Sequence, residues 1–290
     1  MDKIKVGAPA KINLFLKVTG KRDDGYHNIY SWFQAVSLFD HLTFEKSNKP
    51  GFRLKIKNGG NLPADNQNLI VKTAEILFGR FAPGGGLNIE LEKNIPVSAG
   101  LGGGSSDSAA TIYAISRLYK LGLSYKKMQE IGLEIGSDIP FFFSSGQAEV
   151  TGRGEIIKKI VLPLDYSIIL ITPGLAISTT DSYRRLKMDL TSPGKRIRLL
   201  RCNDFKGLVA GIFEIGNDFE RVHLKSFPVL NEIKGVLLSA GAALTRMSGS
   251  GPTIFGLFYN MPEGDGFRKI VRGDWQQHVV QPITLPAWDR

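Results

Sequence analysis

The chain has almost no cysteine, since Cys202 is the single one among 290 residues. A lone cysteine excludes an internal disulfide framework and any CxxC pair, and we expect Cys202 to be a small apolar core side chain. No run of about 18 apolar residues occurs, so we expect no membrane-spanning helix. The opening MDKIKVGAPAKINLFLK lacks a long apolar core and a cleavage site. We therefore expect no secretory signal and a cytoplasmic protein.

Several familiar catalytic motifs are also missing. No lysine follows the glycine run at 100–104, so the P-loop pattern GxxxxGK[ST] is absent. The dinucleotide pattern GxGxxG fails because Ser105 stands where its last glycine should be. The protein-kinase signatures HRD and DFG are absent, and so is the serine-hydrolase elbow GxSxG. These absences argue against P-loop, dinucleotide-binding, protein-kinase and serine-hydrolase chemistry.

Positive charge is in excess, with 37 lysines and arginines against 27 acids and a net charge of +10. A basic balance suits nucleic acid, a membrane surface or small polyanions, or is simply a solvated surface. The densest basic segment, residues 184–201, contains no aromatic side chain. Base stacking on single strands is therefore not suggested, and we assign this segment no role.

The length and the order of elements predict a two-domain α+β protein. A chain of 290 residues suits two packed domains, and strands mix with helices without strict βα alternation. We divide it into 1–160 and 161–290, because Pro163 interrupts an apolar run and a new apolar strand begins at Tyr166. Strands are predicted at KINLFLKV, FRLKIKN and LNIELEK, a hairpin at AEVTGRGEIIKKI and a helix at EGDGFRKIVRG.

The most informative stretch is PVSAGLGGGSS, residues 96–106, between a predicted strand at 87–92 and a helix predicted to start near Ser106. Glycines let the backbone approach an anion without Cβ clashes. A helix N-terminus adds unpaired N–H groups and the positive end of the dipole. The alternative is a flexible loop or packing turn, but a linker would not continue into an alanine-rich helix. We therefore predict a phosphate-binding loop.

Three weaker signals lie far apart in the sequence. Lys11 interrupts an otherwise apolar strand, either as a site residue or as an edge-strand charge that prevents aggregation. Asp138 precedes the apolar run IPFFF, where partial desolvation would raise the pKa of its carboxyl towards useful basicity; alternatively it caps the next turn. The loop from Gly249 to Gly251 is by itself most simply a hairpin turn.

Taken in order, these motifs resemble those of the GHMP small-molecule kinases. PAKINLFLKV resembles the first motif of that family, PVSAGLGGGSSDSAA the second and MSGSGPTIFGLF the third. The likeness runs from about residue 5 to about residue 282. The longer form GLGGGSSD, the stretch GYHNIYS at 25–31, and GSDIPFFF leading into GQAEVTGRGE resemble the branch that acts on a cytidine diphosphate sugar alcohol.

The resemblance implies a reaction and a fold. The γ-phosphoryl group of ATP would pass to a hydroxyl of that alcohol, a middle step of the non-mevalonate route to isoprenoid precursors. The fold would combine an N-terminal ribosomal-protein-like α/β domain with a C-terminal ferredoxin-like domain, and the site would lie in the cleft between them. Mg²⁺ would be required, because phosphoryl transfer depends on charge neutralisation, with the Ser106 hydroxyl as the candidate ligand.

The resemblance also implies roles for individual residues. Asp138 matches the catalytic base, and Lys11 matches the lysine that polarises the attacking hydroxyl and keeps Asp138 ionised. The ATP-phosphate loop is matched by Pro96, Val97, Ser98, Ala99, Gly100, Leu101, Gly102, Gly103, Gly104, Ser105 and Ser106. The substrate positions are matched by Asn13, by Tyr26 and His27 near the cytosine ring, by Tyr183 stacked on that base, and by Gly249 and Ser250 near the substrate phosphates.

Two other functions stay open from the sequence. A nucleic-acid-binding protein with a ribosomal-protein-like fold would use the basic face, and would need neither Asp138 nor the glycine loop. Another GHMP kinase, of the mevalonate or homoserine type, would act on a different alcohol. GYHNIYS argues against the latter, since a nucleobase pocket is superfluous for those substrates. We expect a small-molecule substrate, no nucleic acid or membrane partner, and a monomer or homodimer.

Overall fold

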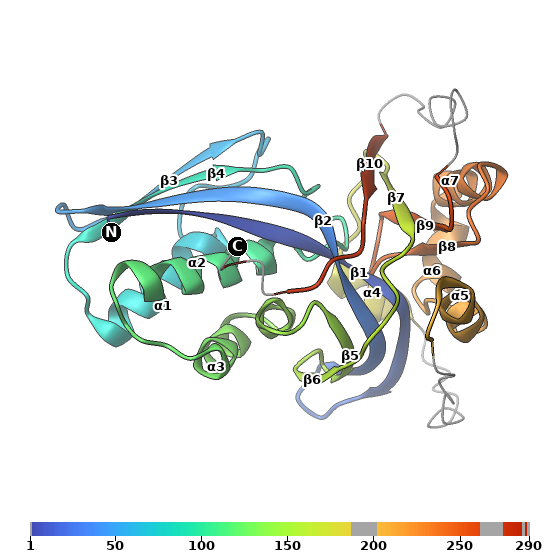
Figure 1. Ribbon diagram of the computed structural model, residues 1–290, viewed down its shortest axis with the longest axis horizontal. Coiled ribbons are helices and arrows are strands. Elements are labelled where there is room, and N and C mark those ends of the chain that lie inside the picture. Colours follow the sequence, from blue (N-terminus) through green and yellow to red (C-terminus); the bar gives the residue numbers. More distant parts are fainter. Residues whose placement is uncertain (1, 187–201, 262–274, 286–287, 289–290) are drawn as a thin grey trace.

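A computed structural model of the chain describes residues 2–186, 202–261 and 275–285 together with Trp288. The helix predicted at 263–273 and most of the basic segment 184–201 lie outside these described residues. The rest of the chain forms two sheets with helices packed against each (Figure 1). Among the described residues, no helix combines the length and the apolar character needed to span a membrane.

The first sheet is built on one long hairpin. Its strands are β1 (Lys3–Lys21), β2 (His27–Ser47), β3 (Gly51–Lys57), β4 (Gly86–Glu92), β5 (Gln147–Gly152) and β6 (Ile156–Lys159). β1 and β2 pair antiparallel along almost their full length, and β2 also pairs with β4 towards one end and with β5 towards the other. β3 runs parallel to β4, and β6 completes the predicted hairpin with β5. The strands predicted in this half are therefore present.

Three helices and one 3₁₀ turn accompany this sheet: two of the helices contact its strands, while the third helix and the turn pack on the longest helix and on each other (Figure 1). They are α1 (Leu69–Phe81), α2 (Gly103–Leu118), α3 (Tyr125–Ile135) and η1 (Ile139–Phe143). α2 begins at Gly103, so the predicted start near Ser106 is three residues late. The reason is that Gly102 adopts a left-handed conformation (φ 69°), which glycine tolerates and which lets the helix begin directly after it.

The second sheet is antiparallel and has the order β10-β7-β9-β8. Its strands are β7 (Ser167–Thr172), β8 (Leu244–Met247), β9 (Ile254–Phe258) and β10 (Gln276–Val280). The helices of this half are α4 (Thr179–Arg185), α5 (Phe205–Phe213), α6 (Glu220–Ser226) and α7 (Pro228–Ser239). Because the strands through Lys159 belong to the first sheet and those from Ser167 to the second, we propose that the domains divide at about residue 160.

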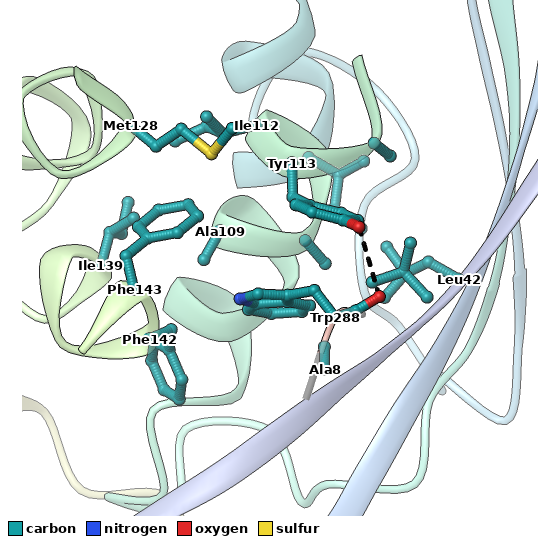
Figure 2. Packing of buried hydrophobic residues seen from close by; sticks show 14 of the residues in the cluster. Ala8, Leu42, Ala109, Ile112, Tyr113, Met128, Ile139, Phe142, Phe143 and Trp288 are labelled. Carbon is teal, nitrogen blue, oxygen red and sulfur yellow. Dashed lines mark hydrogen bonds between the residues drawn. The ribbon is translucent and has the colours of Figure 1, made fainter. Parts of the chain in front are cut away.

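The end of the chain crosses back onto the first sheet. The backbone N–H of Ile283 donates to Ala35 O at 2.9 Å, and that of Leu285 donates to Ser145 O at 2.9 Å. Trp288 then stacks on Tyr113 with 5.7 Å between ring centroids, inside the core that holds Phe142 and Phe143 (Figure 2). The core of the first half is therefore completed by residues that follow the second sheet.

A buried arginine ties the second half to β1. The guanidinium of Arg246 on β8 donates to the carbonyl oxygens of Leu14 at 2.9 Å, Ile212 at 3.0 Å and Phe213 at 3.0 Å. Burial lowers the pKa of Arg246 to about 10, and the three oxygens supply the partners that a buried cation requires. The loop that follows β8 is thereby held against β1, where the candidate site lies.

Candidate active site

A cavity of about 1080 Å³ lies between β1, the 98–102 loop, η1, the β5–β6 hairpin, α4 and the loop after β8. It is lined by eleven of the predicted site residues: Lys11, Asn13, Tyr26, His27, Ser98, Gly100, Gly102, Asp138, Tyr183, Gly249 and Ser250. The structure thus brings together residues from both halves of the chain that the sequence leaves far apart.

A second cavity, of about 480 Å³, follows the glycine loop. Every residue from Pro96 to Ser105 lines it, with Asn68, Leu69, Lys93 and Asp107. Four residues, namely Ser98, Gly100, Gly102 and Thr179, line both cavities. The glycine loop is therefore the wall that the two cavities share.

Lys11 lies on β1 against this wall and is buried, at 4% exposure. Its ammonium lies 3.4 Å from Asp138 Oδ2, donates to Asn13 Oδ1 at 2.7 Å and sits 4.5 Å from the centroid of the Phe33 ring. An edge charge that prevents aggregation would face water, so that alternative for Lys11 is wrong. The structure makes it a buried cation paired with the acid that the sequence singled out.

Asp138 occupies the N-cap position of η1, but its side chain accepts no capping hydrogen bond. The capping alternative for this residue is therefore wrong. Its carboxylate stays one-third exposed at the cavity, while the following residues Ile139–Phe143 are all buried and fix the backbone beneath it. A carboxylate held beside an ammonium and open to a cavity can accept a proton from a bound hydroxyl.

Asn13 holds the lysine in place. Its side-chain oxygen accepts from Lys11, its Nδ2 donates to Ser31 Oγ at 3.0 Å, and its backbone N–H donates to Ser248 Oγ at 3.2 Å. Sequence reasoning found Asn13 but missed Ser31 and Ser248. Only the pairing of β1 with β2 and the approach of the β8–β9 loop bring these two hydroxyls to it.

The glycine loop packs against its neighbours too tightly for side chains. A Cβ on Gly100 would lie 2.1 Å from Ser248 O, and one on Gly102 would lie 2.9 Å from Lys11 Cγ. Both residues also have positive φ, 76° and 69°. These glycines let the loop contact Lys11 and the third motif directly, as well as exposing backbone N–H groups at the start of α2.

Gly249 and Ser250 belong to a loop that is both a hairpin turn and part of the wall of the larger cavity. It joins the antiparallel strands β8 and β9, as a hairpin turn does, and it lines the larger cavity. Gly249 has a φ of 57°, and a Cβ there would lie 3.3 Å from Asn13 Oδ1. Ser250 Oγ lies 2.8 Å from Thr179 Oγ1 of α4.

An ion cluster that the sequence analysis missed supports the smaller cavity. Lys93 donates from its ammonium to Asp40 Oδ2 at 2.5 Å and to Asp107 Oδ2 at 2.7 Å, and all three side chains are buried. Asp40 Oδ1 accepts the backbone N–H groups of Asn94 and Ile95. Burial raises the pKa of Asp107 to about 8, against the opposing charge of Lys93. The cluster joins β2, the end of β4 and the first turn of α2.

Ser106, the predicted metal ligand, is fully buried and is not among the residues lining either cavity. Its hydroxyl has no hydrogen-bond partner among the described residues, and the same holds for Oδ1 of the neighbouring Asp107, which does line the smaller cavity. The described residues hold no group of three or more acidic, histidine or cysteine side chains arranged for a metal ion. Two oxygen atoms near the start of α2 are thus left without partners.

The predicted aromatic residues Tyr26, His27 and Tyr183 all line the larger cavity. The rings of His27 and Tyr183 stack at 4.6 Å with an interplanar angle of 13°, and Tyr26 carries the guanidinium of Arg153 at 5.1 Å. Burial, with the charge of Asp138, raises the pKa of Tyr183 to about 12. Burial and the charge of Lys21 lower the pKa of His27, which favours a neutral ring. Neutral rings of this kind can stack on a planar base.

Comparison with known proteins gives the following relationships. The family described as "GHMP kinases N terminal domain" matches residues 68–146, and "GHMP kinases C terminal" matches residues 196–273. A 4-diphosphocytidyl-2-C-methyl-D-erythritol kinase of Syntrophus aciditrophicus is 40% identical over 97% of this chain and 99% of its own length. A relative of the same name from Thermodesulfovibrio yellowstonii is 39% identical over 96% and 97%.

Solved structures agree with these sequence matches. A crystal structure of 4-(cytidine 5'-diphospho)-2C-methyl-D-erythritol kinase has a TM-score of 0.74 at 30% identity, covering 96% of this chain and 99% of the other. A crystal structure of mevalonate kinase has a TM-score of 0.76 at 16% identity, covering 97% and 100%. The second likeness shows the fold alone.

Proposed function

The chain belongs to the GHMP kinases, in the group of the 4-diphosphocytidyl-2-C-methyl-D-erythritol kinases, and we propose that it phosphorylates the 2-hydroxyl of 4-diphosphocytidyl-2-C-methyl-D-erythritol with ATP. The reaction is a step in making isoprenoid precursors. The observation that carries the proposal is the pairing of Lys11 with Asp138 at 3.4 Å, in a cavity that runs from the glycine loop to the aromatic residues.

The two cavities suit the two substrates. The phosphates of ATP would lie along the glycine loop, where the N-terminus of α2 offers N–H donors and a positive dipole end. The alcohol substrate would fill the larger cavity, with its cytosine beside Tyr26, His27 and Tyr183. The shared wall at Gly100 and Gly102 is then the place where the γ-phosphoryl group meets the hydroxyl.

The transfer itself needs little covalent help from the protein. Asp138 accepts the proton of the 2-hydroxyl as its oxygen forms a bond to the γ-phosphorus. The bond between that phosphorus and the β–γ bridging oxygen breaks, and ADP leaves. Lys11, oriented by Asn13, stabilises the negative charge on the reacting oxygens. Its charge also keeps Asp138 ionised, and an ionised carboxylate can accept the proton.

We infer that Mg²⁺ accompanies ATP. Mg²⁺ in kinase sites is bound by one or two protein oxygens together with substrate phosphates, so a cluster of three acids is not needed. The unpartnered Asp107 Oδ1 is the atom that would hold it, since Asp107 lines the smaller cavity, whereas Ser106 Oγ is unpartnered but fully buried and lines neither cavity. When bound, the ion neutralises charge on the phosphates.

The remaining expectations stay predictions. These are the absence of a nucleic-acid partner, a monomeric or dimeric state and a cytoplasmic location. A mevalonate- or homoserine-type kinase is not favoured, because the curated relatives at about 40% identity carry the cytidyl name, whereas mevalonate kinase is similar at 16% identity.

A coupled ADP-release assay with the cytidyl substrate tests the proposal, using the wild type and Asp138→Asn. Loss of the base should lower kcat by about a hundredfold or more, while the amide keeps the shape of the carboxyl group. Equal rates in both proteins would contradict the role of Asp138. Turnover with mevalonate or homoserine, and none with the cytidyl substrate, would contradict the proposed substrate.

A further inference from the structure

The larger cavity carries positive charge that the transfer step does not use. Lys21 and Arg153 both line it. Arg153 is close enough to Asp24 for its charge to lower the pKa of that carboxyl, but the main partner of Asp24 is Arg22. The acids of this region are engaged elsewhere, since Asp24 pairs with Arg22 at 2.9 Å and Glu155 lies 4.0 Å from the same arginine. Two cations thus line the cavity, and the acids nearby interact mainly with Arg22.

Arg153 is held in position from two sides. Its backbone N–H donates to Glu155 Oε2 at 2.5 Å within the turn of the β5–β6 hairpin. Its guanidinium lies 5.1 Å from the centroid of the Tyr26 ring, in the turn between β1 and β2. A guanidinium resting on an aromatic face keeps its edge N–H groups free to donate to an anion.

The same hairpin turn reaches the proposed base. Gly154, the next residue, has a φ of 126°, and a Cβ there would lie 3.3 Å from Ser137 Cβ and 3.6 Å from Asp138 Oδ1. The turn that carries Arg153 therefore approaches Asp138 through Gly154, while the Arg153 guanidinium packs on Tyr26. In the proposed substrate, the diphosphate lies in the corresponding place, between the cytidine and the alcohol that carries the reacting hydroxyl.

We propose that Arg153 binds the diphosphate of the substrate, with Lys21 as a second cation, and so selects nucleoside-diphosphate alcohols over uncharged ones. This inference rests on the proposed function. The planar guanidinium can donate two parallel hydrogen bonds to a phosphate. Lys21 supplies a point charge at the end of β1, where it is the Cα partner of His27 on β2.

The test compares ligands with and without the diphosphate. Binding of CDP and of cytidine is measured by calorimetry for the wild type, Arg153→Met and Arg153→Lys. Lys158→Met is the matched control, because Lys158 lies in the same hairpin but is 77% exposed and does not line the cavity. KM for the cytidyl substrate and for ATP is measured in parallel.

Arg153→Met should weaken CDP binding about tenfold to a hundredfold and leave cytidine binding unchanged. KM for the cytidyl substrate should rise while KM for ATP stays constant. Arg153→Lys should fall in between, because it keeps the charge but loses the planar fork. Lys158→Met should match the wild type in every measurement.

Two results would overturn the inference while leaving the proposed function intact. One is unchanged CDP binding in Arg153→Met, and the other is an equal loss of CDP and cytidine binding, which would make Arg153 a support for Tyr26. Unchanged cytidine binding also shows that the variant is folded. A wild type that neither binds CDP nor turns over the cytidyl substrate would overturn both proposals together.

Discussion

Gly100 and Ser248 are in backbone contact across the two halves of the chain. Ser248 Oγ donates to Gly100 O at 2.9 Å, and a Cβ on Gly100 would stand 2.1 Å from Ser248 O. The glycine loop and the loop after β8 thus fix each other's position. A side chain at residue 100 has no room unless one of the two loops moves.

Gly100→Ala should therefore be strongly destabilising and should impair ATP binding. The matched control is Gly122→Ala, since Gly122 also has a positive φ (64°) but nothing lies within 4 Å of its added Cβ. We expect about 1 kcal/mol for the control, from backbone strain alone, and about 3 kcal/mol or more for Gly100→Ala. Urea unfolding measures both, and equal losses would show that the contact with Ser248 carries no cost.

Lys11→Met should abolish most of the activity without unfolding the protein. The methionine keeps the apolar stem among buried neighbours but removes the charge beside Asp138, so kcat should fall by about 10²–10³. Lys3→Met is the control, because Lys3 is more than half exposed and pairs with Glu45 on the surface. A kcat within twofold of the wild type for Lys11→Met would contradict its role.

Asp107 gives a prediction about pH. Its pKa is raised to about 8 in the folded chain from an ordinary 3.8, so between these values the folded state binds more protons than the unfolded state. Stability contributed by this group therefore falls as pH rises through the window. The lowered pKa values of His27, His223 and His278 act in the opposite direction. These histidines are the same in the wild type and in an Asp107 variant, so the difference in free energy of unfolding between the two proteins reports Asp107 alone.

Asp107→Asn removes the titration while its side-chain oxygen can still accept from Lys93. Relative to the wild type, its free energy of unfolding should rise steadily from pH 5 to pH 8. Chemical unfolding at several pH values in that range measures the difference. A difference that stays constant with pH would mean that Asp107 is ionised throughout.

Tyr183 should contribute to binding through its ring rather than its hydroxyl. Tyr183→Ala removes the partner of His27 and the proposed stacking surface for the base, so KM for the cytidyl substrate should rise about tenfold. Tyr183→Phe keeps the ring and should bind as the wild type does. If the phenylalanine variant were as weak as the alanine variant, the hydroxyl would be the important group.

The sequence predicts the local features of this protein better than the contacts between them. The strands, the hairpin at residues 147–159 and the glycine loop before α2 follow from periodicity and from glycine and capping chemistry. Lys11 and Asp138 are each ambiguous alone, because each has an ordinary structural explanation, and the family resemblance joined them. The structure rules out the two structural explanations, because Lys11 is buried and the Asp138 side chain makes no capping hydrogen bond, and the catalytic roles stay predictions.

The residues that were missed act through long-range contacts. Lys93 looks like an ordinary charge at the end of a strand, and its role is visible only once Asp40 and Asp107 surround it. Ser248 looks like an ordinary serine of a glycine-rich loop in the sequence, and its role is visible only from its hydrogen bonds to Gly100 and Asn13. Arg153 lies in a hairpin turn, where an exposed arginine is unremarkable, and only the packing on Tyr26 directs it to the cavity.

The return of the chain onto its first sheet has a consequence for how the protein is made. The N-terminal half is synthesised first, and domains usually fold as they emerge from the ribosome. Here Ile283, Leu285 and Trp288 supply hydrogen bonds and core contacts to the first half. That half therefore leaves the ribosome with an incomplete core, and its final packing waits until the second half has been translated.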